Sequence, residues 1–384
     1  MRILVLDTIH GGAELAAALR GAGHEVDEVD VYRGRAGTPI EEALVRTYDL
    51  VTAPVHLDPD HPLLAEHGPA ISHHEMVQRV LGERLPHPFI EITGARGKTT
   101  TAHALASLLP GPGILHTSTG TYRYPERELL WKKSITPASL IPAVREAERV
   151  GGWLVAEESL GVSGAGDVAV LTSPDDYPVA AGKKSAIAEK CRLVGRAAKA
   201  VLSPGIELPG GVRADSIVTF EGGRCRYAGF GVAGTFKNPL CTLAGYRTPL
   251  ALAAATACVL GIDPSPLAAF AALPGRMAAR REGDLLILDN ANSGTNMATT
   301  VEAARYAREL SGGCPLTLVI GEEAHAVCEG FSAENIRRTV AAVNPAATVY
   351  VGEGHEAPTL EAGLALARKM TPAGAVVLAV KTWR

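Results

Sequence analysis

The residues of this chain best suited to chemistry gather in one stretch, FIEITGARGKTTTAHALASLL, which spans residues 89–109. Its first five residues are mostly apolar and β-branched, which is typical of a buried strand, and the segment after Lys98 has helical character. Gly94 and Gly97 let a loop backbone approach an anion closely. Lys98 adds a positive charge for phosphates, and the Thr99 hydroxyl can bind a magnesium ion. The stretch therefore predicts a strand, a phosphate-binding loop and a helix.

The glycine spacing of this loop is shorter than in the general pattern G-x-x-x-x-G-K-[ST], whose first glycine would fall at Ile92. The form found here is T-G-x-x-G-K-T-T. An ordinary turn with a surface lysine is the alternative, but the order of strand, loop and helix favours a nucleotide site. The predicted nucleotide contacts in the loop are Gly94, Ala95, Arg96, Gly97, Lys98, Thr99 and Thr100.

The elements that must position this loop follow from the hydrophobic patterns along the 384 residues. Apolar runs alternate with helical segments at both ends of the chain, which is typical of doubly wound parallel sheets. The segment RLPHP, residues 84–88, has the composition of a linker. We expect an α/β protein of three domains: a Rossmann-like domain at 1–85, a central domain with a P-loop ATPase-type parallel sheet at 86–274, and a Rossmann-like domain at 275–384.

Composition limits the classes of partner. A formal net charge of −4 provides no positive patch for nucleic acid or an acidic membrane, so a small-molecule substrate is expected. The six cysteines have no C-x-x-C spacing, which predicts neither a zinc site nor a disulfide framework. The first residues lack the pattern of a signal peptide, and the longest apolar run, 249–262, is too short to cross a bilayer. These patterns predict a soluble, cytoplasmic protein.

Four motifs, taken in order, resemble the Mur ligases, three-domain ATP-dependent ligases that activate a carboxylate as an acyl phosphate. The first is TGARGKTTT, with Arg96 where that family has asparagine. The second is WLVAEES. The resemblance implies that Glu157 binds the magnesium ion that bridges the γ-phosphate of ATP and the substrate carboxylate. The third is DVAVLTSPDDYP, with Asp176 where the family has histidine. Downstream, AEKCRLV is similar to the segment whose lysine is carbamylated and holds a second magnesium ion, which indicates Lys190.

The fourth motif is PGRMAARREGDLLILDNANSGTN, and the resemblance implies that Arg276 and Asp289 reach the nucleotide from the third domain. ATP and Mg²⁺ are the implied cofactors. Lys98, Glu157 and Lys190 are the implied catalytic residues. The implied metal ligands are Thr99, Glu157, Lys190 and Asp176. Glu158 is a rival to Glu157, because neighbouring side chains of a strand point to opposite faces. Asp176 is equally suited to capping the following turn.

Departures from the family pattern bear on the substrate. The chain lacks the asparagine used for adenine, a signature for an incoming amino acid, and a UDP-binding pattern. The first residues, MRILVLDTIHGGAELA, the short first domain and the short overall length resemble a branch of the family in methanogenic archaea. That branch acts on a nickel tetrapyrrole, seco-F(430) acid, in which an activated propionate is attacked by a ring carbon of the same molecule. The implied activity is an ATP-dependent ring closure to coenzyme F(430), and the alternative is a Mur-type ligase that adds an amino acid.

Candidate substrate contacts lie in the first two predicted domains. His10, Gly11 and Gly12 follow the first strand, where they form either a nest for a carboxylate or a tight turn. The segment 121–137 interleaves aromatic and cationic residues, among them Arg123, and either contacts the substrate or is an exposed hairpin. Thr136 resembles a family Thr-Pro near the substrate. The histidines at positions 56, 61, 67, 73 and 74 do not have the spacing that is typical of metal ligands. Direct contact between one of them and the nickel of the substrate is the alternative.

Overall fold

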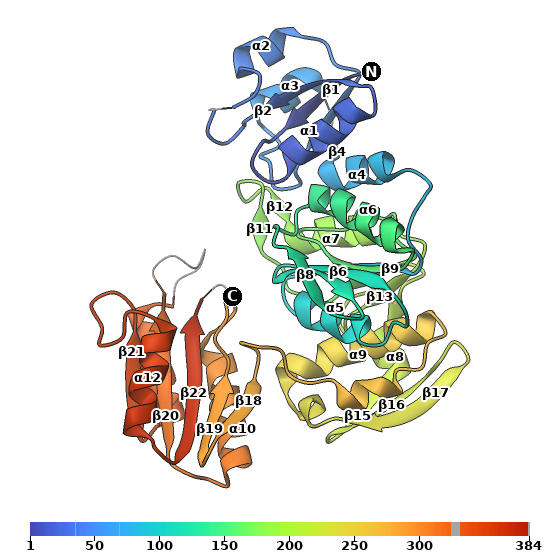
Figure 1. The fold of residues 1–384 in the computed structure, drawn as a ribbon. Coiled ribbons are helices and arrows are strands. Elements are labelled where there is room, and N and C mark those ends of the chain that lie inside the picture. The colour runs from blue at the N-terminus through green and yellow to red at the C-terminus, as the bar shows by residue number, and fades with distance from the viewer. Residues whose placement is uncertain (35, 69, 324–330, 383–384) are drawn as a thin grey trace. The chain divides into compact units, whose positions relative to one another are not determined.

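The computed structural model describes residues 1–34, 36–68, 70–323 and 331–382, and the chain divides into two units, Met1–Ala269 and Phe270–Arg384 (Figure 1). Both units are α/β, as predicted. The three predicted domain limits stay a prediction, and they place the first two domains in the first unit. No helix in the described part of the chain is both long and apolar enough to cross a membrane.

The first unit begins with a parallel sheet in the order β2-β1-β3-β4. Because side chains alternate along β1, its residues serve two cores: Ile3 and Val5 belong to one cluster, Leu4 and Leu6 to the other. Helices α1 and α4 cover the first face, and α2 and α3 cover the second. The elements are β1 Arg2–Leu6, α1 Gly12–Gly21, β2 Glu25–Val29, α2 Ile40–Val45, β3 Leu50–Ala53, α3 Pro62–His67, β4 Ile71–Ser72 and α4 His73–Leu81.

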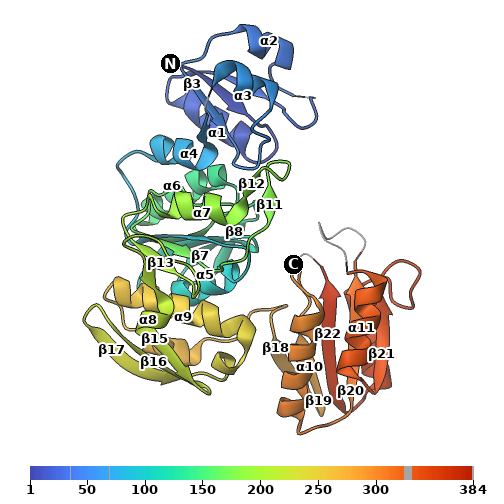
Figure 2. The same cartoon turned by 180° about the vertical axis from the view of Figure 1, so that it is seen from behind.

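The central sheet has the order β14-β13-β10-β5-β9-β6-β7-β8, and only β7 and β8 run antiparallel to their neighbours. Strand β5 is buried along its whole length because helices cover both faces of this sheet (Figure 2). Its strands are β5 Phe89–Thr93, β6 Gly113–Thr117, β7 Gly120–Tyr124, β8 Glu128–Trp131, β9 Trp153–Glu157, β10 Val168–Leu171, β13 Ala200–Leu202 and β14 Val212–Arg213. Its helices are α5 Lys98–Ala106, α6 Leu140–Val150, α7 Ala186–Val194, α8 Ala214–Ile217 and α9 Ala244–Val259.

One hydrophobic cluster joins the first sheet to the central sheet. Met76 and Val77 of α4 pack with Leu15 of α1, and the same cluster continues to Ile141 of α6 and Leu154 of β9. All five side chains are at most 5% exposed. This shared core explains why the first 269 residues form one unit, and it fixes α1 and α4 against the central domain.

Two small antiparallel sheets complete the first unit. Strands β11 Pro178–Val179 and β12 Lys184–Ser185 form a hairpin before α7. The glycine-rich segment that follows α8 forms three strands: β15 Val218–Glu221, β16 Arg224–Gly229 and β17 Val232–Lys237. Helix α9, built of small residues, packs closely on α5, the helix of the phosphate loop.

The second unit is a five-stranded sheet in the order β18-β19-β22-β20-β21, with β18 antiparallel to β19 and the other pairs parallel. Helix α12 covers one face and α10 and α11 cover the other, so the predicted doubly wound arrangement is confirmed (Figures 1 and 2). The elements are β18 Ala278–Glu282, β19 Leu285–Asp289, α10 Met297–Ser311, β20 Leu316–Glu322, α11 Ala333–Val343, β21 Ala347–Val351, α12 Leu360–Met370 and β22 Gly374–Lys381. The five cysteines among the described residues are free thiols, and Cys328 lies outside the described residues.

Candidate active site

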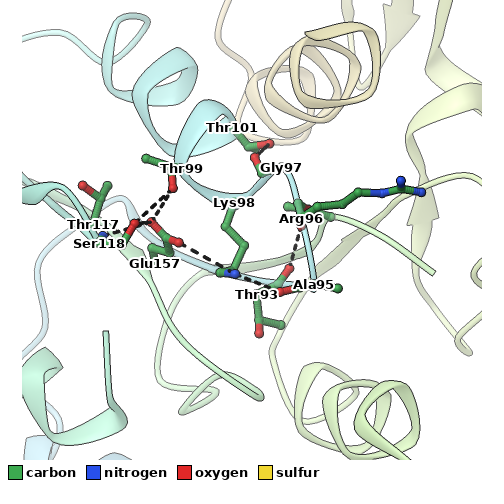
Figure 3. Close-up of polar contacts among 12 residues, drawn as sticks. Thr93, Ala95, Arg96, Gly97, Lys98, Thr99, Thr101, Thr117, Ser118 and Glu157 are labelled. Carbon is green, nitrogen blue, oxygen red and sulfur yellow. Dashed lines mark hydrogen bonds and ion pairs between the residues drawn. The ribbon is translucent and has the colours of Figure 1, made fainter. Parts of the chain in front are cut away.

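The phosphate loop lies between β5 and α5, as the sequence predicts (Figure 3). Gly94 has a φ of 147°, and a Cβ atom there would lie 2.1 Å from Oγ1 of Thr172. Gly97 caps α5 in the left-handed region at a φ of 84°. Both positions therefore require glycine because their φ angles are positive. At Gly94 a side chain would also have no space. The loop that results exposes the amino end of α5, which attracts anions.

Two residues at the end of β10 hold this loop in place. Ser173 Oγ accepts hydrogen bonds from the backbone N–H groups of Ala95 at 3.0 Å and Arg96 at 3.4 Å. Thr172 Oγ1 donates to the carbonyl oxygen of Arg96 at 2.6 Å. The motif comparison did not single out Thr172 or Ser173. Their position directly after a parallel strand, in the sheet that contains the loop, is the signal that identifies them.

Glu157, the last residue of β9, faces the start of α5. Its Oε2 accepts hydrogen bonds from Thr99 Oγ1 at 3.0 Å and from the backbone N–H of Ser118 at 3.1 Å, and Lys98 Nζ lies 3.8 Å from its Oε1 (Figure 3). Glu157 is 2% exposed, so these contacts fix its position. The structure thus brings together Lys98, Thr99 and Glu157 and adds Ser118, which the sequence analysis had missed.

Glu158, the rival carboxylate, has different surroundings. It is fully buried, and burial together with the neighbouring Glu91 carboxylate raises its pKa well above the usual range, so Glu158 is neutral. Glu91 itself binds the loop after β9 through hydrogen bonds from Ser163 and Gly166. A neutral, enclosed carboxyl is a poor ligand for a cation. Of the two neighbours, only Glu157 carries the contacts to the phosphate loop.

Lys190 is completely buried on α7. Its Nζ donates to Tyr177 Oη at 3.3 Å and lies 4.5 Å from the centre of that ring. Burial, followed by the positive charge of Lys98, lowers the pKa of Lys190 to about 8. A substantial fraction of this amine is therefore neutral near pH 8, and a neutral amine is the form that reacts with carbon dioxide. The environment is suited to a carbamylated lysine.

Asp175 and Asp176 follow β10 and have different contacts. Asp175 forms an ion pair with Arg96, whose Nε lies 2.9 Å from Oδ2 of the carboxylate. Asp176 instead accepts hydrogen bonds from Ser185 Oγ at 2.8 Å and from the Ile187 backbone N–H at 3.0 Å, and these bonds, the Ile187 one foremost, lower its pKa. Both oxygens of Asp176 thus contact the start of α7, and its predicted role as a metal ligand stays a prediction.

The segment His10–Gly12 lies where β1 meets α1 and packs against Thr136. A Cβ atom at Gly11 would lie 2.7 Å from Thr136 Oγ1, and one at Gly12 would lie 1.7 Å from the carbonyl oxygen of Asp7. Close approach therefore explains both glycines. His10 and Thr136 line the same cavity, so the structure brings these two predicted substrate contacts together.

The remaining predicted contacts lie elsewhere. Arg123, in the β7–β8 hairpin, forms ion pairs of 2.9 Å with both Glu128 and Glu146. Asp289, at the end of β19 in the second unit, accepts hydrogen bonds from the backbone N–H groups of Gly275 and Ala291. Arg276 follows this Gly275 directly. Asp289 thus shapes the loop that carries Arg276, and the predicted contact of both with the nucleotide stays a prediction.

The donor set around the phosphate loop fits a magnesium ion. Magnesium prefers hard oxygen ligands, and Thr99 Oγ1 and the Glu157 carboxylate lie 3.0 Å apart at the amino end of α5. In addition, Thr93 Oγ1 at the start of the loop is buried without a hydrogen-bond partner among the described residues. Lys98, whose Nζ lies 3.8 Å from the Glu157 carboxylate, and the amino end of α5 contribute positive charge, which favours anionic phosphates together with the ion.

The fold is shared with solved Mur ligases. One is the UDP-N-acetylmuramoylalanyl-D-glutamyl-2,6-diaminopimelate–D-alanyl-D-alanyl ligase of Acinetobacter baumannii, with a TM-score of 0.54, 13% identity, and coverage of 84% of this chain and 83% of that one. Another is a pseudomurein peptide ligase type C of Methanothermus fervidus, with a TM-score of 0.50, 15% identity, and coverage of 99% and 96%. The chain therefore has the three-domain fold of the Mur ligases.

Sequence similarity identifies the particular family. A protein of Methanosarcina acetivorans, the coenzyme F(430) synthetase, is 31% identical over 415 aligned positions that cover 86% of this chain and 85% of the relative. The profile of the family described as "Coenzyme F430 synthetase CfbE, C-terminal domain" matches residues 279–382. The chain belongs to the coenzyme F(430) synthetase family, and it is an enzyme.

Proposed function

We propose that this enzyme uses ATP to activate a propionate side chain of a nickel tetrapyrrole, seco-F(430) acid, and closes a carbocyclic ring to give coenzyme F(430), ADP and phosphate. The observation that carries the proposal is the cluster of Lys98, Thr99 and Glu157 at the amino end of α5. The family membership of the chain supports the choice of substrate.

The first step is the transfer of the γ-phosphoryl group. A carboxylate oxygen of the substrate attacks the γ-phosphorus, the bond to the bridging oxygen breaks, and ADP leaves as an acyl phosphate forms. Two anions must approach each other, so positive charge near the transferred group lowers the barrier. Lys98 is placed to bind the β- and γ-phosphate oxygens, and the exposed amino end of α5 attracts the phosphates. A bound magnesium ion supplies further charge neutralisation.

The second step forms the carbon–carbon bond. A ring carbon of the same molecule loses a proton to a base from solvent, its electron pair attacks the acyl carbon, and the carbon–oxygen bond to phosphate breaks, releasing inorganic phosphate. No second substrate enters. Phosphate leaves an acyl phosphate far more readily than an oxide ion would leave a free carboxylate. The residues of this chain hold the two reacting groups together and keep water away from the acyl phosphate.

Glu157 and Lys190 have separate roles in this scheme. Thr99 and Glu157 would hold the magnesium ion that contacts the γ-phosphate. Lys190, once carbamylated, would present a second carboxylate-like group, and its lowered pKa favours that modification. Arg276 and Asp289 of the second unit would complete the nucleotide site. These assignments rest on the motif order and on the contacts described for each unit.

A turnover assay tests the proposal. The enzyme is mixed with ATP, Mg²⁺ and seco-F(430) acid, with and without added amino acids, and the products are followed by mass spectrometry. Ring closure predicts loss of one water from the substrate mass and one ADP per product, without any amine. Strict dependence on an amine would instead identify the amide ligase considered as the alternative. Absence of any ATP turnover with the tetrapyrrole would refute the proposed substrate.

A further inference from the structure

Four histidines from three separate segments line one cavity in the first unit. His10 follows β1, His56 follows β3, and His73 and His74 begin α4. The cavity has a volume of about 280 Å³, and Thr136 lies in its wall. The spacing of these histidines in the sequence is not typical of metal ligands, so their convergence is a property of the fold.

His10 is oriented by a buried carboxylate. Asp7 is fully buried at the end of β1. Its carboxylate accepts hydrogen bonds from the backbone N–H groups of Ile9 at 2.7 Å and His10 at 2.8 Å. Nδ1 of the His10 ring lies 3.5 Å from Oδ2 of the same carboxylate. A carboxylate beside Nδ1 favours the tautomer with its proton on that atom, which leaves the lone pair of Nε2 available. The His10 side chain is 45% exposed, so a ligand can reach it.

Aromatic rings surround His10. Its ring lies edge-on to Tyr32, with centroids 5.0 Å apart, and edge-on to His56, with centroids 4.8 Å apart. Tyr32 and His56 stack with an angle of 16° between their planes. Burial lowers the pKa of His56 and raises that of Tyr32, so both rings are neutral near pH 7. The rings beside His10 are therefore aromatic and neutral, which suits a conjugated ligand.

The other two histidines contribute polar atoms without partners. His73 and His74 are each 2% exposed, and burial lowers their pKa values to about 3 and about 4, so both are neutral. His74 Nε2 donates to the Ser159 carbonyl oxygen at 2.9 Å. Nε2 of His73 and Nδ1 of His74 have no hydrogen-bond partner among the described residues. Buried polar atoms are rarely left unpaired, so these two nitrogens mark an unsatisfied polar site beside the cavity.

We propose that this histidine pocket binds the metal-bearing face of the tetrapyrrole substrate, with Nε2 of His10 as an axial ligand to its metal. The inference rests on the proposed function, because the ligand is the substrate named there. A metal inside a tetrapyrrole already has four nitrogen ligands in its plane, so one imidazole from the protein is enough. Among the described residues no group of three or more His, Cys, Asp or Glu could hold a free ion, which agrees with a metal carried by the ligand.

The volume of the cavity limits how much of the macrocycle it can hold. A volume of about 280 Å³ accommodates one part of a tetrapyrrole, so the rest of the ring lies outside the cavity. Thr136 lies in the wall together with His10, which places the pocket next to the loop that precedes α6. The neutral histidines and the apolar side chains of Val55 and Leu160 complete a surface that excludes water from the face of the ligand.

The test uses the full-length enzyme and seco-F(430) acid without ATP, so that no turnover occurs. Affinity is measured by absorption titration, and nickel K-edge X-ray absorption reports the number of axial ligands. We expect wild-type enzyme to add one axial nitrogen. His10→Ala should remove this nitrogen and weaken binding by about 10-fold or more, while the affinity for the metal-free tetrapyrrole changes little. His10→Gln, which keeps a polar side chain of similar length, should behave like His10→Ala.

Two control variants separate the roles of the histidines. His24→Ala removes a histidine outside the pocket and should leave both affinity and spectrum unchanged. His56→Ala should weaken binding through the lost ring contact but keep the axial nitrogen. Loss of the axial nitrogen in His56→Ala, together with its retention in His10→Ala, would overturn the assignment to His10.

The remaining outcomes distinguish this inference from the proposed function. If wild-type enzyme converts the tetrapyrrole yet its bound nickel shows no axial nitrogen from the protein, the inference is wrong and the function stands. If the enzyme neither binds nor converts the tetrapyrrole, both are wrong. Nucleotide binding by each variant is measured in parallel, and its retention shows that a loss at the pocket is not a loss of folding.

Discussion

The phosphate loop and the histidine pocket differ in how the chain builds them. The phosphate loop is contiguous: its glycines, Lys98 and Thr99 lie within a few residues, and one distant residue, Glu157, completes the cluster. The histidine pocket is assembled from separate segments of the first unit, and each of them contributes one to three residues. A local motif can therefore be recognised in the sequence, whereas a pocket formed by residues far apart in the sequence can be recognised only in the folded structure.

The two sites also differ in charge. At the phosphate loop, Lys98 and the amino end of α5 contribute positive charge, which suits a polyanionic nucleotide. In the histidine pocket burial keeps the rings of His56, His73 and His74 neutral, which suits a flat, conjugated ligand. If the phosphate loop binds the nucleotide and the histidine pocket binds the tetrapyrrole, a substitution in one site should leave ligand binding at the other site intact.

The largest expected effect is that of Lys98→Ala. Removal of this charge from the phosphate loop should lower kcat/KM by about 10²–10³-fold or more, because the transferred phosphoryl group loses a stabilising cation. Tetrapyrrole binding without ATP should be unchanged. Steady-state kinetics and an absorption titration measure the two effects. Lys199→Ala, at an exposed position, is the matched control. Equal loss of nucleotide and tetrapyrrole binding in Lys98→Ala would show that the two sites are not independent.

The next effect concerns the glycine that shapes the histidine pocket. A Cβ atom at Gly12 would lie 1.7 Å from the Asp7 carbonyl oxygen, so Gly12→Ala must displace the turn that carries His10. We expect a loss of about 1–3 kcal/mol in the free energy of unfolding and a loss of tetrapyrrole binding, with nucleotide binding retained. Gly21→Ala in the same helix meets no atom within 4 Å and should be neutral or stabilising by about 0.5–1 kcal/mol. Chemical denaturation compares them, and equal behaviour of both variants would contradict the close approach at Gly12.

A smaller effect is expected from the pH dependence of stability at Lys190. Its pKa of about 8 in the folded chain lies below the ordinary value of 10.5, so between these pH values the unfolded chain binds a proton that the folded chain does not. The free energy of unfolding should therefore receive a contribution that rises with pH across this window. Lys190→Met should remove that contribution, whereas Lys184→Met, in a partly exposed position, should keep it. Denaturation curves at pH 8 and pH 10, recorded in buffer free of carbon dioxide and bicarbonate so that Lys190 stays a free amine, measure the difference, and an unchanged slope in Lys190→Met would refute the lowered pKa.

The smallest effect is expected at the ion pair of Arg96 and Asp175. The Arg96 side chain is 77% exposed, so Arg96→Asn should change the free energy of unfolding by no more than about 1 kcal/mol. A double-mutant cycle with Asp175→Asn measures the coupling. If Arg96 contacts the phosphates of bound nucleotide, Arg96→Asn should raise the KM for ATP more than Asp175→Asn does. Equal effects of the two variants on KM would leave Arg96 with a structural role alone.

Much of the fold was predictable because its elements are encoded locally. The strand, loop and helix of the phosphate site follow from FIEIT, the glycines and Lys98, and the sheet of the second unit follows from alternating apolar runs. Alternation along β9 also shows that only one of Glu157 and Glu158 can face the loop. It does not show which one, because that choice depends on the neighbours of β9, and Glu91 encloses Glu158 from a different strand.

The contacts that the sequence could not reveal are all long-range. Thr172 and Ser173 fix the phosphate loop only because β10 pairs with β5, and Ser118 reaches Glu157 only because β6 pairs with β9. His10 and His73 meet because α4 packs on the same core as α1. These pairings are set by the whole sheet, and no short pattern around any one of these residues encodes them.

The central claim, that a substrate carboxylate passes through an acyl phosphate, is tested most directly by oxygen transfer. The propionate of seco-F(430) acid is labelled with oxygen-18, the enzyme turns it over with ATP and Mg²⁺ and no amine, and the released phosphate is analysed by mass spectrometry. The account predicts one labelled oxygen in each phosphate released, because the bond between the acyl carbon and the carboxylate oxygen breaks after that oxygen has been phosphorylated. Ring closure with unlabelled phosphate would contradict it.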